Sequence, residues 1–204
     1  MANMSQNAPL LPGRAALHGT KAATSANPNG GKPGFVFSEM AHLGKLNLRA
    51  DKTAAKAVKS VTGCAFPPDA NRFTAAGERR VVWLSPDEYL IICEAGKDDD
   101  ILGALNVALK NRHYAVNNIS DALTAFKLSG PASRQVLAKG CALDLHPKQF
   151  VAGDCAQSLL SHAGITLLAL SDHEFIILCR TSFAAYMHAW LFDAALEFGV
   201  TFKT

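Results

Sequence analysis

Several common signatures of chemistry are missing from this sequence of 204 residues. No Gly-x-Gly-x-x-Gly run follows a strand pattern, which excludes a dinucleotide site of the usual doubly wound kind. No Gly-x-x-x-x-Gly-Lys-[Ser/Thr] run is present either, which excludes the common phosphate-binding loop. None of the seven histidines lies two or four positions from another, so local metal chelation has no starting point. These absences predict no catalytic, cofactor-binding or metal-binding residue in the chain.

Cysteine is also sparse, and its spacing excludes two further classes of protein. The chain has five cysteines, an odd number, and no two of them lie within four positions of each other. This spacing argues against both a disulfide framework and a zinc knuckle. We therefore expect reduced, structural cysteines at the five positions Cys64, Cys93, Cys141, Cys155 and Cys179.

Charge of one sign is absent from the start of the chain, because residues 1–37 contain three bases and no acid. Without those three, the 20 Lys and Arg fall to 17 and equal the 17 Asp and Glu. A body without a basic surplus is not expected to bind nucleic acid. No apolar run is long enough to span a bilayer, and the N-terminus has no secretory pattern. These features predict a cytoplasmic protein that does not bind membranes.

Residues 1–34 are rich in Asn, Ala, Pro, Gly and Lys, with a cluster of structure-breaking residues at 28–34. Such a composition does not bury enough apolar surface to offset the entropy lost on ordering. We expect residues 1–34 to form a flexible low-complexity tail. Residues 35–204 are then expected to form a single domain.

That domain contains two similar stretches, residues 85–93 and residues 171–179, which align without a gap. In each, an apolar run precedes a Ser, a short polar turn follows, and a second apolar run ends in Cys. Both predict a β-hairpin. The similarity predicts a duplication, with halves at about residues 35–115 and 116–204.

Helical patterns flank each predicted hairpin in the same order. A strand at 45–49 precedes a helix at 53–62, and a strand at 125–128 precedes Pro131 and a helix at 132–139. Further helices are expected after the hairpins, over 101–109 and over 183–195. The predicted fold class is α+β, a duplicated strand–helix–hairpin–helix unit with mostly antiparallel strands.

Three clusters could in principle carry chemistry, and each also has an ordinary structural interpretation. Free amides after the Gly-Pro pair could hold an anion, or that segment could be a strand-to-helix turn. A Cys near a Lys and a His could be an activated thiol, or a buried residue after a helix cap. A third, acidic cluster fits an exposed hairpin turn. We favour the structural interpretation for all three clusters, which are Ser129-Gly130-Pro131-Ala132-Ser133, Lys139-Gly140-Cys141 with Asp144 and His146, and Asp172-His173-Glu174.

The chain resembles the sarcosine oxidase gamma subunit family over roughly residues 45–200. The resemblance is carried by residues 116–121 (Val-Asn-Asn-Ile-Ser-Asp), 126–132 (Phe-Lys-Leu-Ser-Gly-Pro-Ala) and 137–147 (Leu-Ala-Lys-Gly-Cys-Ala-Leu-Asp-Leu-His-Pro). Residues 83–90 and 182–186 are similar to the central hairpin and the C-terminal helix of that family. The segment 119–147 is the most specific part of the match.

This resemblance implies a fold like the folate-binding, aminomethyltransferase-type domain of the glycine cleavage system. It also implies a cytoplasmic heterotetramer, in which alpha, beta and delta subunits are the partners, that oxidatively demethylates sarcosine to glycine. The FAD, FMN, NAD and tetrahydrofolate sites belong to other subunits in that family. The resemblance therefore implies a non-catalytic gamma subunit that serves assembly and is not expected to be an enzyme alone.

Three alternatives remain open at the level of sequence. One is a stand-alone folate-binding or one-carbon-transfer protein of the same fold, with Asp121 or Asp144 as the carboxylate that would bind the pterin. Lys139-Gly140-Cys141 is similar to a motif of folate-binding iron–sulfur maintenance proteins, but the chain departs from it at residue 142. Another is the small subunit of a related N-methyl amino acid dehydrogenase. The third is a small hydrolase that uses Cys141 and His146, for which no orienting third group is evident.

Overall fold

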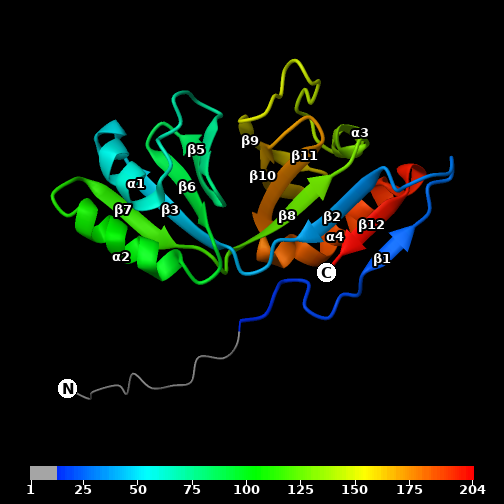
Figure 1. Cartoon of the computed structure of the whole chain (residues 1–204), viewed down its shortest axis with the longest axis horizontal. Coiled ribbons are helices and arrows are strands. Elements are labelled where there is room, and N and C mark those ends of the chain that lie inside the picture. The colour runs from blue at the N-terminus through cyan, green and yellow to red at the C-terminus, as the bar shows by residue number, and fades with distance from the viewer. Residues whose placement is uncertain (1–12) are drawn as a thin grey trace.

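The computed structural model describes residues 13–204 and contains two β-sheets that face each other, with helices on their outer sides (Figure 1). Within these residues, a five-stranded sheet has the order β4-β5-β6-β3-β7 and a seven-stranded sheet has the order β1-β12-β2-β8-β11-β10-β9. The strands of the five-stranded sheet are β3 (Gly44–Ala50), β4 (Phe73–Ala76), β5 (Arg79–Ser85), β6 (Glu88–Cys93) and β7 (Tyr114–Asn118). Those of the seven-stranded sheet are β1 (Ala23–Ser25), β2 (Phe35–Glu39), β8 (Leu123–Ser129), β9 (Cys155–Leu160), β10 (Ala163–Ala169), β11 (Glu174–Arg180) and β12 (Val200–Lys203).

Each sheet has its own pair of helices. Helices α1 and α2 pack on the five-stranded sheet, and α3 and α4 pack on the seven-stranded sheet. Their bounds, with those of the short 3-10 turns, are η1 (Lys52–Ala54), α1 (Ala55–Thr62), α2 (Asp98–Ala108), α3 (Ser133–Ala138), η2 (Thr181–Phe183), α4 (Ala184–Ala194) and η3 (Leu196–Phe198). The mixed α+β class predicted from the sequence is confirmed.

A third apolar core lies between the two sheets. Leu90 and Ile92 of β6 contribute to it from one side, and Ile176 and Leu178 of β11 contribute from the other. The alternate residues of these two strands face the helices instead. Strands β6 and β11 are thus buried on both faces, which explains why their sequences are nearly continuous apolar runs.

Both predicted hairpins are confirmed. Strands β5 and β6 pair antiparallel with Val81 opposite Ile91, and β10 and β11 pair antiparallel with Leu167 opposite Ile177. In each case the second strand of the hairpin also pairs with the strand that precedes the hairpin's helix in the sequence, β6 with β3 and β11 with β8. The repeated sequence pattern therefore corresponds to a repeated local pairing.

The predicted tail over residues 1–34 requires correction in its described part; residues 1–12 lie outside the described residues. Strand β1 pairs with β12, and Leu17 is buried against the core of the seven-stranded sheet. Pairing with the edge of an existing sheet supplies backbone hydrogen bonds that the composition alone does not reveal. The predicted start of order at residue 35 is therefore too late.

The predicted boundary between halves, at about residue 115, also differs from the structure. Strand β7 spans this position and belongs wholly to the five-stranded sheet. Strand β2, predicted to belong to the first half, pairs antiparallel with β8 and parallel with β12 in the other sheet. The chain thus crosses between the sheets twice, through residues 40–43 and through residues 119–122.

Candidate functional site

The turn at Gly130 uses its backbone amides within the chain itself. Gly130 N donates to His173 O at 3.1 Å, and Ala132 N donates to Gly34 O at 3.0 Å. Gly130 has a φ of +120°, and a Cβ there would lie 2.3 Å from Gly34 O, so only glycine fits. Helix α3 begins at Ser133, later than predicted, because the preceding residues form this turn. The segment is a strand-to-helix turn and its amides are not available to an anion.

The second cluster, around Cys141, is dispersed in the structure. Lys139 Nζ donates to Ala194 O and pairs with Glu197, and its ammonium group lies over the Phe198 ring. The Cys141 thiol is buried and lies 3.7 Å from Ser158 Oγ. His146 is exposed, and its Nδ1 accepts a hydrogen bond from Lys148 N. The structure does not assemble the Lys, Cys and His into an activated thiol, which removes the geometric basis of the hydrolase alternative.

The third cluster forms the turn between β10 and β11. The backbone carbonyl of Asp172 accepts a hydrogen bond from Arg134 Nε at 3.0 Å, and Glu174 pairs with Lys127 at 3.2 Å. The carbonyl of His173 accepts from Ser133 Oγ at 3.2 Å, while its side chain is exposed. The hydrogen bonds from Ser133 and Arg134 hold the start of α3 on this turn, and the Glu174–Lys127 pair joins β11 to β8.

The five cysteines are free and buried, as predicted. Burial raises the pKa of the Cys93 and Cys179 thiols to about 11 and that of Cys155 to about 12, and it also raises the pKa of Cys64. These four thiols are therefore protonated at neutral pH and unreactive. In the described part of the chain, no three His, Cys, Asp or Glu side chains gather in a metal-binding arrangement. No helix among residues 13–204 has the length and apolar character needed to cross a membrane.

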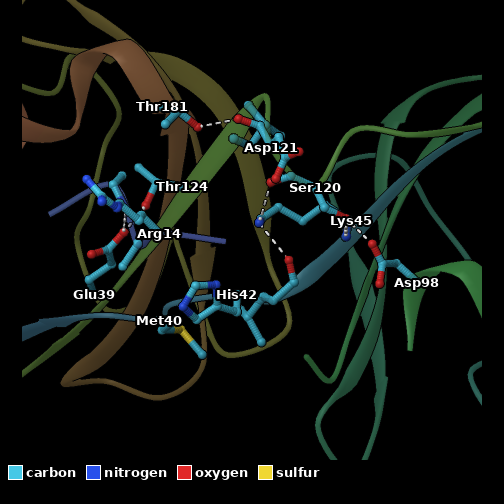
Figure 2. A pocket seen from close by; sticks show the side chains of 14 residues that line it. Arg14, Glu39, Met40, His42, Lys45, Asp98, Ser120, Asp121, Thr124 and Thr181 are labelled. Atoms are coloured by element: carbon cyan, nitrogen blue, oxygen red, sulfur yellow. Dashed lines mark hydrogen bonds between the residues drawn. The ribbon is translucent and has the colours of Figure 1, made fainter. Parts of the chain in front are cut away.

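A polar cavity of about 170 Å³ lies where the chain crosses between the two sheets (Figure 2). Its walls come from the segment before β1, which contributes residues 14–16 and is called the arm below, from the two crossing segments, and from the ends of β2, β3, β8 and α2. Of the two carboxylates considered for a pterin, Asp121 lines this cavity. Asp144 instead accepts a hydrogen bond from His146 N, at 2.9 Å, within its own turn.

Lys45 forms the floor of the cavity and is only 3% exposed. Its Nζ donates to Leu43 O at 2.7 Å and to Ser120 O at 2.9 Å, one carbonyl from each crossing segment. Its backbone N donates to Ser120 Oγ, and its backbone carbonyl accepts from Ile119 N. Burial lowers the pKa of Lys45, and the nearby Asp121 and Asp98 carboxylates partly oppose this shift. Lys45 therefore ties the two crossing segments together.

Two other carboxylates of the cavity are held by internal hydrogen bonds. Glu39 accepts from Ala16 N at 2.9 Å, Leu17 N at 3.0 Å and Thr124 Oγ1 at 3.0 Å, which fixes the arm over the cavity. Asp98, the first residue of α2, accepts from the side chains of Asn118 and Ser120, each at 2.8 Å. Burial opposes the ionisation of Asp98, but these hydrogen bonds outweigh it and lower its pKa.

Comparison with known proteins places this fold in a family. A model described as "Sarcosine oxidase, gamma subunit family" matches residues 47–197. The chain belongs to the sarcosine oxidase gamma subunit family. It is 31% identical to sarcosine oxidase subunit gamma of Corynebacterium sp. (strain U-96) over 182 residues, which cover 87% of each chain. It is also 31% identical to the Arthrobacter sp. subunit gamma over 166 residues, which cover 80% of this chain and 81% of the relative.

Solved structures agree with membership of the gamma subunit family. A chain of heterotetrameric sarcosine oxidase from Corynebacterium sp. U-96 superposes with a TM-score of 0.77 at 29% identity, covering 85% of this chain and 88% of the other. Aminomethyltransferase T of the glycine cleavage system from Bartonella henselae matches with a TM-score of 0.60 at 13% identity, covering 84% of this chain and 48% of that protein. The second likeness concerns the fold alone, and it confirms the predicted resemblance to an aminomethyltransferase-type fold.

The cavity around Lys45 was not predicted from the sequence. In the β3 pattern, Lys45 alternates with Leu46 and Leu48 and so shares a face with Asn47 and Arg49, which resembles an exposed polar face. Arg49 is indeed exposed, whereas Lys45 is covered by residues that lie far away in the sequence. The only local signal is the position of Lys45 directly after Gly44, at the start of a largely buried strand.

Proposed function

We propose that this chain is the non-catalytic gamma subunit of a heterotetrameric sarcosine oxidase and that its role is assembly. The proposal rests mainly on the match to curated gamma subunits over 87% of the chain. It is supported by the three sequence clusters, whose polar groups are either bound within the chain or kept apart from each other. We expect the assembled enzyme to demethylate sarcosine oxidatively to glycine.

The partners in this proposal are alpha, beta and delta subunits, in the cytoplasm. The FAD, FMN, NAD and tetrahydrofolate sites would lie in those other subunits. The buried, protonated state of four cysteines supports a chain without redox chemistry of its own. The identity of the oxidised N-methyl amino acid would also be decided in another subunit.

The finer architecture in this proposal is a duplication. The unit β3-α1-β4-β5-β6-α2 and the unit β8-α3-β9-β10-β11-α4 have the same order of elements along the chain. Their strands also lie in the same spatial order, β4-β5-β6-β3 and β9-β10-β11-β8. Together with the alignment of residues 85–93 and 171–179, this agreement supports two copies of one ancestral unit.

Co-expression of all four subunits tests the proposal. Omission of this chain is expected to reduce recovery of the complex, because an assembly subunit completes interfaces between its partners. Substitutions Cys141→Ser and His146→Gln in the full complex should leave kcat for sarcosine within about twofold, well below the losses typical of catalytic groups. A large loss of kcat in a complex that assembles normally would refute the non-catalytic role.

The partner surface can be mapped in the same system through the exposed apolar side chains. Val107 on α2 is 78% exposed and Leu159 on β9 is 59% exposed. A change of either residue to Asp would weaken co-purification if that residue is buried against a partner. Lys148→Gln, at an exposed position, serves as the control.

The folate-binding alternative receives less support from the structure. The cavity lined by Asp121 measures about 170 Å³, whereas pockets for ligands of drug size measure roughly 300–1,000 Å³. Titration of the purified chain with tetrahydrofolate decides this question, and saturable binding would favour the alternative. Assays of the assembled complex with sarcosine and with N-methylglutamate separate sarcosine oxidase from a related N-methyl amino acid dehydrogenase.

A further inference from the structure

The cavity at the crossing of the two sheets carries unused charges of both signs. Lys45 lies buried at its floor, while Arg14, His42 and Asp121 are exposed at its mouth. In Figure 2 the Lys45 side chain reaches from β3 into the space that Asp121, His42 and Thr124 surround, and Arg14 lies beyond it. We propose that this cavity binds a small zwitterionic amino acid, with the ligand carboxylate on Lys45 and Arg14 and the ligand ammonium group on Asp121.

Lys45 supplies the first argument, because its ammonium group has more N–H donors than it has acceptors among the described residues. An ammonium group has three N–H donors, and the Lys45 Nζ makes two hydrogen bonds, both to backbone carbonyls. Among residues 13–204 no carboxylate lies within ion-pair distance of this Nζ. Burial of a charge without a counter-ion is costly. A ligand carboxylate would supply a third acceptor and a charge at ion-pair distance, which the nearby Asp121 and Asp98 carboxylates do not provide.

The remaining charged groups select a zwitterion over a simple anion. Within the described residues, the side chains of Arg14 and Asp121 form neither a hydrogen bond nor an ion pair. Glu39 and Asp98, by contrast, are held by hydrogen bonds from the chain itself. The uncommitted groups that line this cavity are thus the cation Arg14, the third donor of Lys45 and the anion Asp121. This pattern complements a molecule that carries one charge of each sign.

The size of the cavity limits the ligand to a small amino acid. A volume of about 170 Å³ is below the range of roughly 300–1,000 Å³ found for ligands of drug size. Glycine and N-methylglycine have the required charges and few heavy atoms. The inference does not rest on the proposed function, because a chain without catalytic groups can still bind such a ligand.

The test uses the full chain in isothermal titration with glycine and N-methylglycine, and with acetate and methylamine as probes that each carry one of the two charges. We expect saturable binding of the amino acids and affinities about tenfold or more lower for acetate and methylamine. Asp121→Asn and Arg14→Gln should each weaken binding about fivefold or more, since each removes one charge partner. Lys148→Gln and Asp193→Asn, at exposed positions outside the cavity, should leave the affinity unchanged.

A second readout follows the arm directly. Because Arg14 would contact the ligand, cleavage by trypsin after Arg14 should slow when glycine is added, while cleavage after Lys21 should not. Asp121→Asn should abolish this protection. The two test variants, Arg14→Gln and Asp121→Asn, change exposed side chains, so both are expected to fold as the wild type does.

Three results would overturn the inference. The first is no saturable binding up to about 100 mM ligand, a concentration at which even sites far weaker than most specific ones would fill. The second is acetate binding as tight as glycine binding. The third is an Asp121→Asn variant that binds glycine as tightly as the wild type does. If the chain is obtained only within the complex, the wild-type complex is compared with the Arg14→Gln/Asp121→Asn complex, because all other sites are then identical. Turnover of sarcosine is measured separately, so failure of ligand binding here is distinguishable from failure of the proposed function.

Discussion

The five-stranded and seven-stranded sheets share an arrangement of four strands but differ in the strands that are added to it. In both, four strands follow the same spatial order, but β7 then completes the smaller sheet directly. The larger sheet continues instead with β2, β12 and β1, which come from the two ends of the described chain. Local sequence thus governs the hairpins and their helices, whereas pairing between distant segments makes the two sheets different.

The cores of the two units differ in a related way. Tyr89 of β6 and Phe175 of β11 occupy matching positions in the two aligned stretches, and both are buried. Tyr89 stacks on the partly exposed Phe66 at 4.3 Å, whereas Phe175 lies fully buried under Arg134. The strands added to the larger sheet bring further buried aromatic side chains, which are Phe35, Phe37 and Phe202.

Truncation of the two matched rings should have the largest effect. Phe175→Ala should lower the free energy of unfolding by about 3–5 kcal/mol, because it leaves a cavity in a close-packed core. Tyr89→Ala should cost less, since Phe66 is partly exposed and that side of the core can relax. Urea denaturation of both variants measures the difference, and a larger loss for Tyr89→Ala would break the comparison.

Exchange of the two rings sharpens the comparison at a smaller scale. Phe175→Tyr places a hydroxyl in an apolar core and should cost about 1–3 kcal/mol if the hydroxyl finds no partner. Tyr89→Phe loses only a 3.5 Å hydrogen bond to Pro86 O, so a change of about 0.5 kcal/mol or less is expected. Equal losses for the two substitutions would show that the two cores are equivalent after all.

Glu39 holds the arm, the segment before β1, in place through hydrogen bonds from the Ala16 and Leu17 amides. Glu39→Gln retains the size of the side chain but removes an acceptor and the charge that three donors share, so a local loss of about 1 kcal/mol is expected. Hydrogen exchange at the Ala16 and Leu17 amides should accelerate. Exchange in the core strand β11 should not change, and Glu78→Gln, at an exposed position, provides the matched control.

The smallest effect concerns His188 of α4, which packs against Phe37, Phe192 and Phe202. Its Nε2 is buried and has no hydrogen-bond partner among residues 13–204, and burial lowers the pKa of His188. Because the unfolded pKa is about 6.5, the unfolded state binds more protons below that pH, and stability should fall as the pH is lowered through this range.

The substitution His188→Phe should remove this part of the acid sensitivity. Thermal unfolding at several pH values between about 5 and 7.5 compares it with the wild type. If the two slopes are the same, His188 does not contribute to the acid dependence of the larger sheet.

Much of this fold could be predicted because its signals are local. The apolar runs around residues 85–93 and 171–179 specify two hairpins, and the structure confirms both. The helices predicted at 101–109 and 183–195 correspond closely to α2 and α4. The reduced state of the five cysteines was also predicted, from their odd number and wide spacing, and all five are free and buried.

The larger errors of prediction concern contacts between distant residues. Strand β1 has only three residues and forms because β12 offers an edge, which its own composition does not indicate. Strand β2 joins the sheet of the second unit through a parallel pair with β12. Lys45 was missed for the same reason. Its ammonium group is buried in part by Ser120, which lies 75 residues further along the chain.

The parallel pair of β2 and β12 has a consequence for the order in which the chain folds during synthesis. Residues 44–118 contain every strand of the five-stranded sheet, so this unit can close while the ribosome is still translating the second half. The seven-stranded sheet is complete only after Val200–Lys203 has been made, because β1 then gains its neighbour and β2, which also pairs with β8, gains its second. Until then the phenylalanines of β2 remain without their final packing, and the nascent chain is most vulnerable to aggregation and proteolysis.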